Sequence, residues 1–321
     1  MNRLRGTAAA IALLSAALAA AGCGLGPGAG VGSVELTATR EFGAVPVLRR
    51  SLEAKESDTV MRLLEASAEV QTRYGGGYVH SIDGVAEEER GGDPYDWFFY
   101  VDGTESPLGA AEFSVQGGER IWWDFRDWAA TDHVPAVVGS WPAPFVAGVA
   151  GKRYPVVVEC AGASPGSPPT HAVQGEPRVG WSAACAATRA ALTGEGVDLA
   201  SGSPKGAIRV LVGPWRRLRE DPAARLVEAG PAESGIYADF TPGGGLEALD
   251  EGGARARDLG SGAGLVAATS RYGGPPVWLV TGGTDGAVLE AAESLDAQHL
   301  RDHYAVAIEA GKETPLPVAG R

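Results

Sequence analysis

Two short stretches of this chain decide its fold: residues 93–102, DPYDWFFYVD, and residues 120–128, RIWWDFRDW. Successive side chains of a β-strand point to opposite faces of the sheet, so large rings would stand on both faces here. One face takes Trp97, Phe99, Val101, Ile121, Trp123 and Phe125, and the other takes Phe98, Tyr100, Trp122, Asp124 and Arg126. A sheet with one solvated face needs apolar residues on one side only. We therefore predict that both faces of this sheet are covered.

The segments around these stretches predict an α+β domain over residues 33–130. Residues 33–40 (SVELTATR) alternate apolar and polar side chains, as in a half-buried strand. After Ser57-Asp58-Thr59, where an Asp or a Thr suits the helix cap, apolar residues recur at helical spacing, so a helix is expected that ends near Tyr74. Further strands are expected at residues 45–52, 78–82, 97–101 and 120–125. Two strands, a helix and then more strands is the order of a β-grasp-like domain, with the helix across one face.

Four motifs in this domain carry a family resemblance. They are VHSIDG (79–84), DWFFYVDG (96–103), the pair Gly109-Ala110, and GGERIWWDF (117–125). Their order and spacing resemble the transcobalamin-like C-terminal domain family over residues 33–128, although Asp102 stands where Asn is usual and Glu119 where Asp is usual. That family includes the β-domain of animal cobalamin carriers and bacterial surface proteins. The resemblance implies a cobalamin-like or other amphipathic ligand, but the helical barrel that completes the animal site is not evident in this sequence.

The second aromatic face has two candidate covers. One is the second domain of the chain itself, which would make the aromatic sheet a structural or protein-interaction element. The other is a small amphipathic ligand stacked on the rings, because an uncovered aromatic patch of this size marks a binding site. The residues predicted to hold such a ligand are Tyr78, Trp97, Tyr100, Trp122, Asp124 and Trp128.

The N-terminus has the pattern of an export signal. Arg3 and Arg5 precede an apolar, Ala-rich run that ends in small residues before Cys23. This resembles a bacterial lipoprotein signal over residues 1–22, with Cys23 as the lipidated first residue of the mature chain; an ordinary signal peptide followed by an incidental cysteine is the alternative. Residues 23–32 would form a Gly-rich tether. The predicted location is therefore outside the cytoplasm, on the membrane surface.

The rest of the chain predicts a second domain of α/β type. Residues 131–150 are Pro-rich and apolar and are expected to be an ordered connector. Residues 151–310 alternate strands and capped helices, which favours an α/β domain with partly parallel strands, and residues 311–321 are expected to form a flexible tail. Cys160 and Cys185 remain as an even pair in an exported chain and predict a disulfide, with two buried thiols as the alternative.

No motif in the sequence predicts catalysis, a cofactor or a metal. The turn at residues 281–286 (TGGTDG) lacks the spacing of phosphate-binding loops and is expected to be a turn with a helix cap. His299 and His303 are four residues apart, but no third ligand is evident, so no metal is predicted. The formal net charge of −13 argues against nucleic acid as a partner.

Taken together, these patterns predict a non-enzymatic, lipid-anchored surface protein. It would bind a small amphipathic molecule and pass it to a membrane transporter. The competing prediction is a structural or interaction lipoprotein whose aromatic sheet packs only on its own second domain.

Overall fold

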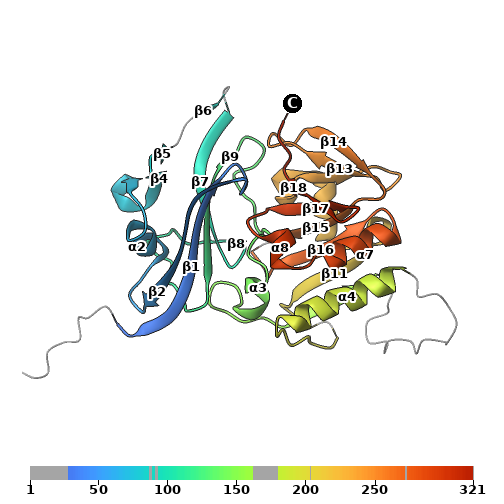
Figure 1. Cartoon of the computed structure of the whole chain (residues 1–321), viewed down its shortest axis with the longest axis horizontal. Coiled ribbons are helices and arrows are strands. Elements are labelled where there is room, and N and C mark those ends of the chain that lie inside the picture. Colours follow the sequence, from blue (N-terminus) through green and yellow to red (C-terminus); the bar gives the residue numbers. More distant parts are fainter. Residues whose placement is uncertain are drawn as a thin grey trace, which may run out of the picture.

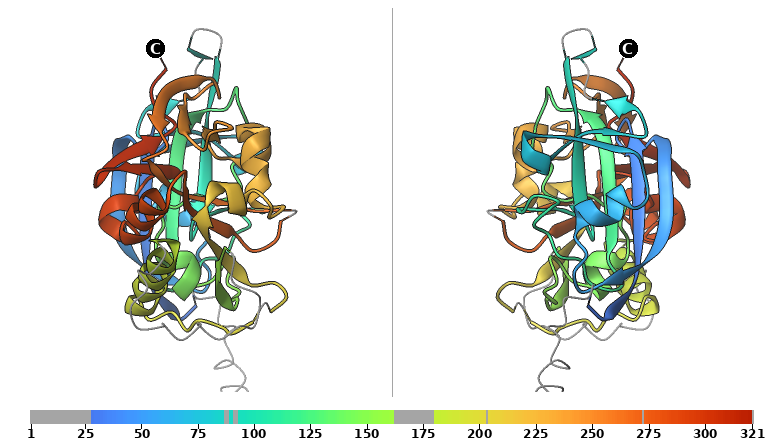
Figure 2. Two further views of the ribbon diagram at one scale, coloured as in Figure 1. Left: turned by 90° about the vertical axis from the view of Figure 1, so that its right-hand side faces the viewer. Right: turned by 90° about the vertical axis from the view of Figure 1, so that its left-hand side faces the viewer.

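A computed structural model describes residues 28–86, 89–90, 93–161, 180–202, 204–271 and 273–320. The predicted signal peptide and Cys23 lie outside the described residues. Within them the chain is a mixed α/β protein with more strand than helix. Figure 1 shows two large sheets, an N-terminal one built from the blue to green strands and a C-terminal one built from the yellow to red strands. Figure 2 views the molecule from each of these two sides.

The N-terminal sheet has the strand order β2-β1-β9-β7-β6, with β8 paired to β7. Its bounds are β1 Gly30–Arg40, β2 Val45–Lys55, β6 Glu89–Arg90, β7 Asp93–Val101, β8 Thr104–Glu105 and β9 Arg120–Asp127. The two aromatic stretches are neighbouring antiparallel strands, with Phe99 opposite Trp123 and Tyr100 opposite Trp122. β9 also runs parallel to β1, which begins three residues earlier than the sequence predicted.

The helix of the N-terminal half is shorter than predicted. Helix α2 covers only Val60–Glu65, and the Thr59 hydroxyl accepts a hydrogen bond from the backbone N–H of Arg62 at its start. The chain then forms β3 (Val70–Arg73), because Val70 and Thr72 are β-branched and pair better on a pleated surface. A separate small sheet results, with the bounds β3 Val70–Arg73, a 3-10 turn η1 Tyr74–Gly76, β4 Tyr78–Ile82 and β5 Val85–Ala86.

Both faces of the N-terminal sheet are covered, as the alternation of rings predicted. Trp97, Phe125 and their neighbours on one face pack with α2 in one apolar core. Tyr100 and Trp122 on the other face belong to a different core, which they share with residues of the C-terminal half.

The C-terminal sheet has the order β10-β11-β16-β15-β17-β18 and is parallel from β10 to β16, so the predicted parallel strands are confirmed. Helices α4 and α7 cover its outer face (Figure 1). The bounds are β10 Val156–Cys160, α4 Gly180–Gly194, β11 Ile208–Pro214, β15 Gly264–Thr269, β16 Val277–Gly282, α7 Asp285–Glu293, α8 Ala297–Leu300, β17 Ala305–Glu309 and β18 Lys312–Leu316. The turn at residues 281–286 leads into α7, which Thr284 caps.

Smaller elements extend this half and change one prediction. Residues 312–316 form β18 where a flexible tail was predicted. The tail is ordered because Leu316 is buried and β18 completes the hydrogen bonding of β17. The remaining bounds are α3 Ala143–Val146, α5 Trp215–Leu218, η2 Ala224–Ala229, α6 Pro231–Ser234, β12 Ala238–Phe240, β13 Leu246–Leu249 and β14 Arg255–Gly260, with β12 to β14 forming a three-stranded sheet.

The Pro-rich connector is ordered and lies between the two large sheets. Val134 and Val137 pack in the core that contains Tyr100 and Trp122. Val138 and Trp141 pack instead in the core beneath α4 and α7. The connector therefore contributes to both cores of the C-terminal half.

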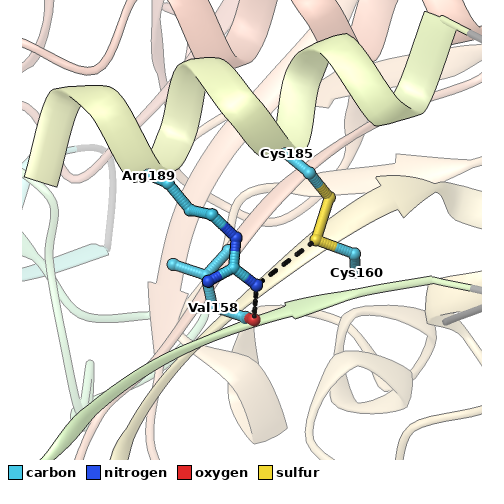
Figure 3. The surroundings of a disulfide bond; sticks show 4 residues. All are labelled: Val158, Cys160, Cys185 and Arg189. Carbon is cyan, nitrogen blue, oxygen red and sulfur yellow. Dashed lines mark hydrogen bonds between the residues drawn. A yellow bond between two sulfur atoms is a disulfide. The ribbon is translucent and has the colours of Figure 1, made fainter. Parts of the chain in front are cut away.

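The predicted disulfide joins Cys160, at the end of β10, to Cys185 in α4. The Arg189 guanidinium, one turn further along α4, donates to the Val158 carbonyl at 2.9 Å and lies beside the Cys160 sulfur (Figure 3). The bond therefore fastens α4 to the edge strand of the C-terminal sheet. No helix in the described parts of the chain is long and apolar enough to cross a bilayer.

Candidate functional site

The inner face of the N-terminal sheet meets the C-terminal half in an aromatic seam. We use this name for Phe42, Tyr100, Trp122 and Tyr304, whose rings contact one another edge to face or tilted. The Tyr304 ring centroid lies 5.0 Å from Phe42, 5.3 Å from Trp122 and 5.6 Å from Tyr100. Because Tyr304 directly precedes β17, the C-terminal half supplies the ring that closes this face.

Asp124 is the polar centre of the seam and is fully buried. Its Oδ1 accepts hydrogen bonds from the Thr39 hydroxyl at 2.5 Å and from the Gly43 backbone N–H at 3.1 Å. Its Oδ2 accepts one from the Tyr304 hydroxyl at 3.1 Å. The Trp122 indole N–H donates to the Thr39 hydroxyl at 2.7 Å, which completes the network. One carboxylate thus joins β1, β9 and the C-terminal half.

Burial has the largest effect on the pKa values of the acidic groups in this network. It raises the pKa of Asp124 to about 6, although the bonds from Thr39, Gly43 and Tyr304 act in the opposite direction. Burial also raises the pKa of the Tyr304 and Tyr100 hydroxyls well above their usual range. Both phenols therefore stay neutral over the whole physiological range, and the Tyr304 hydroxyl can donate to Asp124 throughout it.

Arg126 lies at the far end of the seam. Its side chain is fully buried, and its guanidinium donates to the carbonyls of Asp127, Thr131 and Asp132. The guanidinium carbon lies 3.8 Å from the ring centroid of Phe98, a close cation–π contact. Arg126 therefore fastens the start of the connector to the end of β9.

Two glycines allow the two halves to approach this closely. Gly43 has a φ of +90°, and a Cβ there would lie 1.7 Å from the carbonyl oxygen of Asp302. A Cβ on Gly139 would lie 2.7 Å from the His303 backbone nitrogen and 2.8 Å from the Trp122 ring. Both positions require glycine because backbone of the C-terminal half occupies the space of a side chain.

The structure does not gather the six predicted ligand residues into one site. Tyr100, Trp122 and Asp124 come together, but they are at most 3 % exposed and the C-terminal half covers them. Trp97 faces the α2 core instead, where its indole N–H donates to the Val85 carbonyl.

The other two predicted ligand residues are more accessible. Tyr78 is half-buried, its hydroxyl donates to Asp96, and its ring contacts the exposed ring of Tyr74. Trp128 is 38 % exposed just beyond the end of β9. The cover of the second aromatic face is thus the chain's own C-terminal half, as the structural alternative anticipated.

A cavity of about 590 Å³ opens at the edge of the N-terminal sheet, beside α3. We call it the rim cavity. Such a volume lies within the usual range of small-molecule sites. Its apolar wall includes Val34, Pro142, Ala143 and Val146, and its polar wall includes Ser33, Glu35, Arg49, Arg50, Ser51, Glu119 and Arg120.

Three arginines converge on one carboxylate at this cavity. Glu35 Oε1 accepts from Arg301 Nη1 at 2.7 Å and from Arg49 Nη1 at 3.2 Å, and Glu35 Oε2 lies 3.2 Å from Arg120 Nε. Arg49 also pairs with Asp302. We call Glu35, Arg49, Arg120 and Arg301 the rim cluster. Because Glu35 and Arg120 are register partners in β1 and β9, the cluster belongs to the same sheet face as Trp122 and Asp124.

The charges at the rim cavity are dominated by arginine. The rim cluster together with Arg50 and Asp302 holds four guanidiniums and two carboxylates, a surplus of two positive charges. Burial lowers the pKa of Arg120, and the neighbouring cations Arg301 and Arg49 act in the same direction. Burial also raises the pKa of Glu119 to about 7, so Glu119 offsets the surplus only above that pH.

The sequence analysis did not predict the rim cluster or Tyr304, although the strand alternation contained part of the information. Glu35 and Arg120 occupy polar positions of strands whose alternation was recognised, so their common face could have been inferred. Arg301 and Tyr304 come from a distant part of the chain, and nothing in the sequence placed them against β1 and β9.

The histidines of residues 299–303 were weighed as metal ligands in the sequence. His299 Nδ1 lies 2.9 Å from a carboxylate oxygen of Asp296, the residue that caps α8. Within the described ranges, no group of three or more His, Cys, Asp or Glu side chains could hold a metal ion.

One comparison with known protein families locates its match in the N-terminal half. Residues 57–127 match the family model described as "Domain of unknown function (DUF4430)". No curated protein matches the chain. A solved structure of a candidate metal-binding protein from Ruminococcus gnavus is similar at 11 % identity and a TM-score of 0.24, covering 30 % of this chain and 97 % of its own.

The buried Asp124 carboxyl predicts a pH-dependent stability. Its folded pKa, about 6, lies above its ordinary value of 3.8, so the folded state binds this proton more tightly than the unfolded state. The resulting stabilisation is complete below about pH 4 and is lost as the pH rises through 6, a change on the order of 2 kcal/mol. Urea denaturation of the wild type and Asp124→Asn, compared from pH 4 to pH 7, measures it.

The expected result is a wild-type free energy of unfolding that falls relative to Asp124→Asn across this range. Asp198→Asn, at an exposed position where no side-chain hydrogen bond is found among the described residues, serves as the control and should follow the wild type. Parallel curves for the wild type and Asp124→Asn would contradict the raised pKa.

Proposed function

We propose that this protein is an exported, lipid-anchored surface protein that binds a small amphipathic molecule without chemical conversion and delivers it to an uptake transporter. The rim cavity carries this proposal. It places an apolar wall from α3 opposite a charged wall from β1, β2 and β9, which is the arrangement an amphipathic ligand needs.

The sequence resemblance supports the same class of function. Under this proposal, the N-terminal half is a β-grasp-like domain of the transcobalamin-like type, and a cobalamin-like molecule is the ligand that the resemblance favours. The aromatic seam then serves as a rigid support for the rim cavity rather than as the binding surface itself.

A second candidate function follows from the burial of the seam. Since Tyr100, Trp122 and Asp124 pack on the C-terminal half, the aromatic sheet has a structural role that requires no ligand. The protein would then be a structural or protein-interaction lipoprotein. Occupancy of the rim cavity by a small molecule distinguishes the two functions.

Filling the rim cavity should abolish ligand binding. Val146 is half-buried on its apolar wall, so Val146→Trp places a large ring in the space without disturbing a fully buried position. The full chain is titrated with cobalamin, followed by visible absorbance and tryptophan quenching, and with the neutral amphipathic dye N-phenyl-1-naphthylamine, followed by dye fluorescence. We expect saturable binding of at least one probe by the wild type and a loss of about tenfold or more in Val146→Trp.

Leu108→Trp is the matched control, because Leu108 is exposed and does not line the cavity. It should bind as the wild type does. If the wild type binds neither probe, the structural alternative is favoured. If it binds the dye alone, cobalamin is excluded as the ligand, while the rim cavity is kept as the binding site.

The lipid anchor is tested separately. Cys23→Ala removes the thiol that lipidation requires, so this variant should lose the incorporation of labelled palmitate that the wild type shows. Autoradiography of the immunoprecipitated chain measures the change, with Cys185→Ala as the control that keeps Cys23. Labelling of Cys23→Ala at the wild-type level would contradict lipidation at this residue.

A further inference from the structure

The rim cluster holds more positive charge and more hydrogen-bond donors than its own carboxylates use. Each arginine carries five N–H donors in a planar fork. Among the described residues, Arg301 donates only to Glu35 in the interactions observed, and Arg50 donates only to the backbone carbonyl of Arg49. A single carboxylate with about four acceptor positions cannot satisfy three guanidiniums.

The cluster is also accessible. The side chains of Arg49 and Arg301 are 42 % and 39 % exposed, while that of Arg120 is 14 % exposed and is held by the Trp141 carbonyl at 2.9 Å. Arg120 is thus a positioned cation at the back of the cavity, and Arg49 is a more adaptable one at its mouth.

This concentration of arginine contrasts with the rest of the molecule. The chain carries a formal net charge of −13, so its overall field repels anions. The rim cavity differs from this average, because its surroundings hold a surplus of two positive charges below about pH 7 and of one above it, where Glu119 is ionised. Arginine forks match carboxylate, sulfonate and phosphate groups geometrically.

We propose that the rim cavity selects an anionic amphipathic molecule, whose acidic group binds Arg49 and Arg120 while its apolar part lies against Pro142, Ala143 and Val146. This inference rests on the proposed function and specifies its ligand class. The acidic group lies beside Glu35 in the rim cluster and accepts hydrogen bonds from arginine N–H groups that Glu35 does not use. The positive charge of Arg301, in the C-terminal half, also attracts the bound anion, so both halves contribute to the site.

Two dyes that differ only in their acidic group test the inference. 8-Anilinonaphthalene-1-sulfonate carries a sulfonate on the same aromatic frame as N-phenyl-1-naphthylamine, which is neutral. Both are titrated against the full chain, and the dissociation constants are read from dye fluorescence. We expect the sulfonate to bind the wild type about tenfold more tightly than the neutral dye.

Arginine variants then locate the contact. Arg49→Gln should remove most of the preference for the sulfonate and leave the neutral dye within about twofold, because only a charge-assisted contact is lost. Arg120→Gln should act in the same way, and since Arg120 is partly buried, its far-ultraviolet circular dichroism is checked beside it. Arg216→Gln, at an exposed position outside the cavity, is the control and should keep the preference.

The outcomes separate this inference from the function on which it rests. Equal affinity for the two dyes, with both lost in Val146→Trp, would overturn the anionic ligand class while the binding function stands. An unchanged preference in Arg49→Gln and Arg120→Gln would overturn the assigned contact. Failure of the wild type to bind either dye or cobalamin would reject the proposed function itself.

Discussion

The buried carboxyl of Asp124 is the interaction on which the rest of this structure depends. A carboxyl group without partners in an apolar interior is strongly unfavourable, so its position fixes the groups around it. Thr39, Gly43 and Tyr304 each donate to it, and they come from β1, from the turn after β1 and from the C-terminal half. Placing Asp124 correctly therefore sets both the register of the N-terminal sheet and the docking of the second half on it.

The side chains on one face of β9 connect the buried carboxyl of Asp124 with the accessible rim cluster. Arg120, Trp122, Asp124 and Arg126 share the inner face, so a single strand contributes one residue to the rim cluster, one to the aromatic seam, its buried carboxyl and the anchor of the connector. The C-terminal half covers the middle of that face, while the cavity opens at its Arg120 end. The aromatic seam holds the two halves together, while the arginines of the rim cluster supply positive charge. We propose that the ligand binds at the rim cluster.

The sequence was sufficient to predict local features of the fold, but it did not predict the rim cavity that we propose as the ligand site. The alternation of apolar side chains along β7 and β9 correctly predicted two covered faces, because it depends only on local strand geometry. The disulfide was predicted correctly because two cysteines remain in the chain after Cys23. The long helix to Tyr74 was wrong, since β-branched residues after Glu65 favour pairing with β4. The approach of Arg301 and Tyr304 depends on Gly43 and Gly139, whose contacts join residues far apart in the chain. Sequence periodicity does not predict such contacts, so Tyr100, Trp122 and Asp124 were predicted as ligand residues although the second half covers them.

Hydrogen exchange of Tyr304→Ala, followed by mass spectrometry, tests most directly whether the seam makes the two halves one unit. The substitution removes the ring that covers Tyr100 and Trp122 and one donor to Asp124. If the seam couples the halves, the amides of β9 around Trp122–Phe125 should lose protection together with those of β17. Loss of protection confined to β17, with β9 exchanging as in the wild type, would contradict this account.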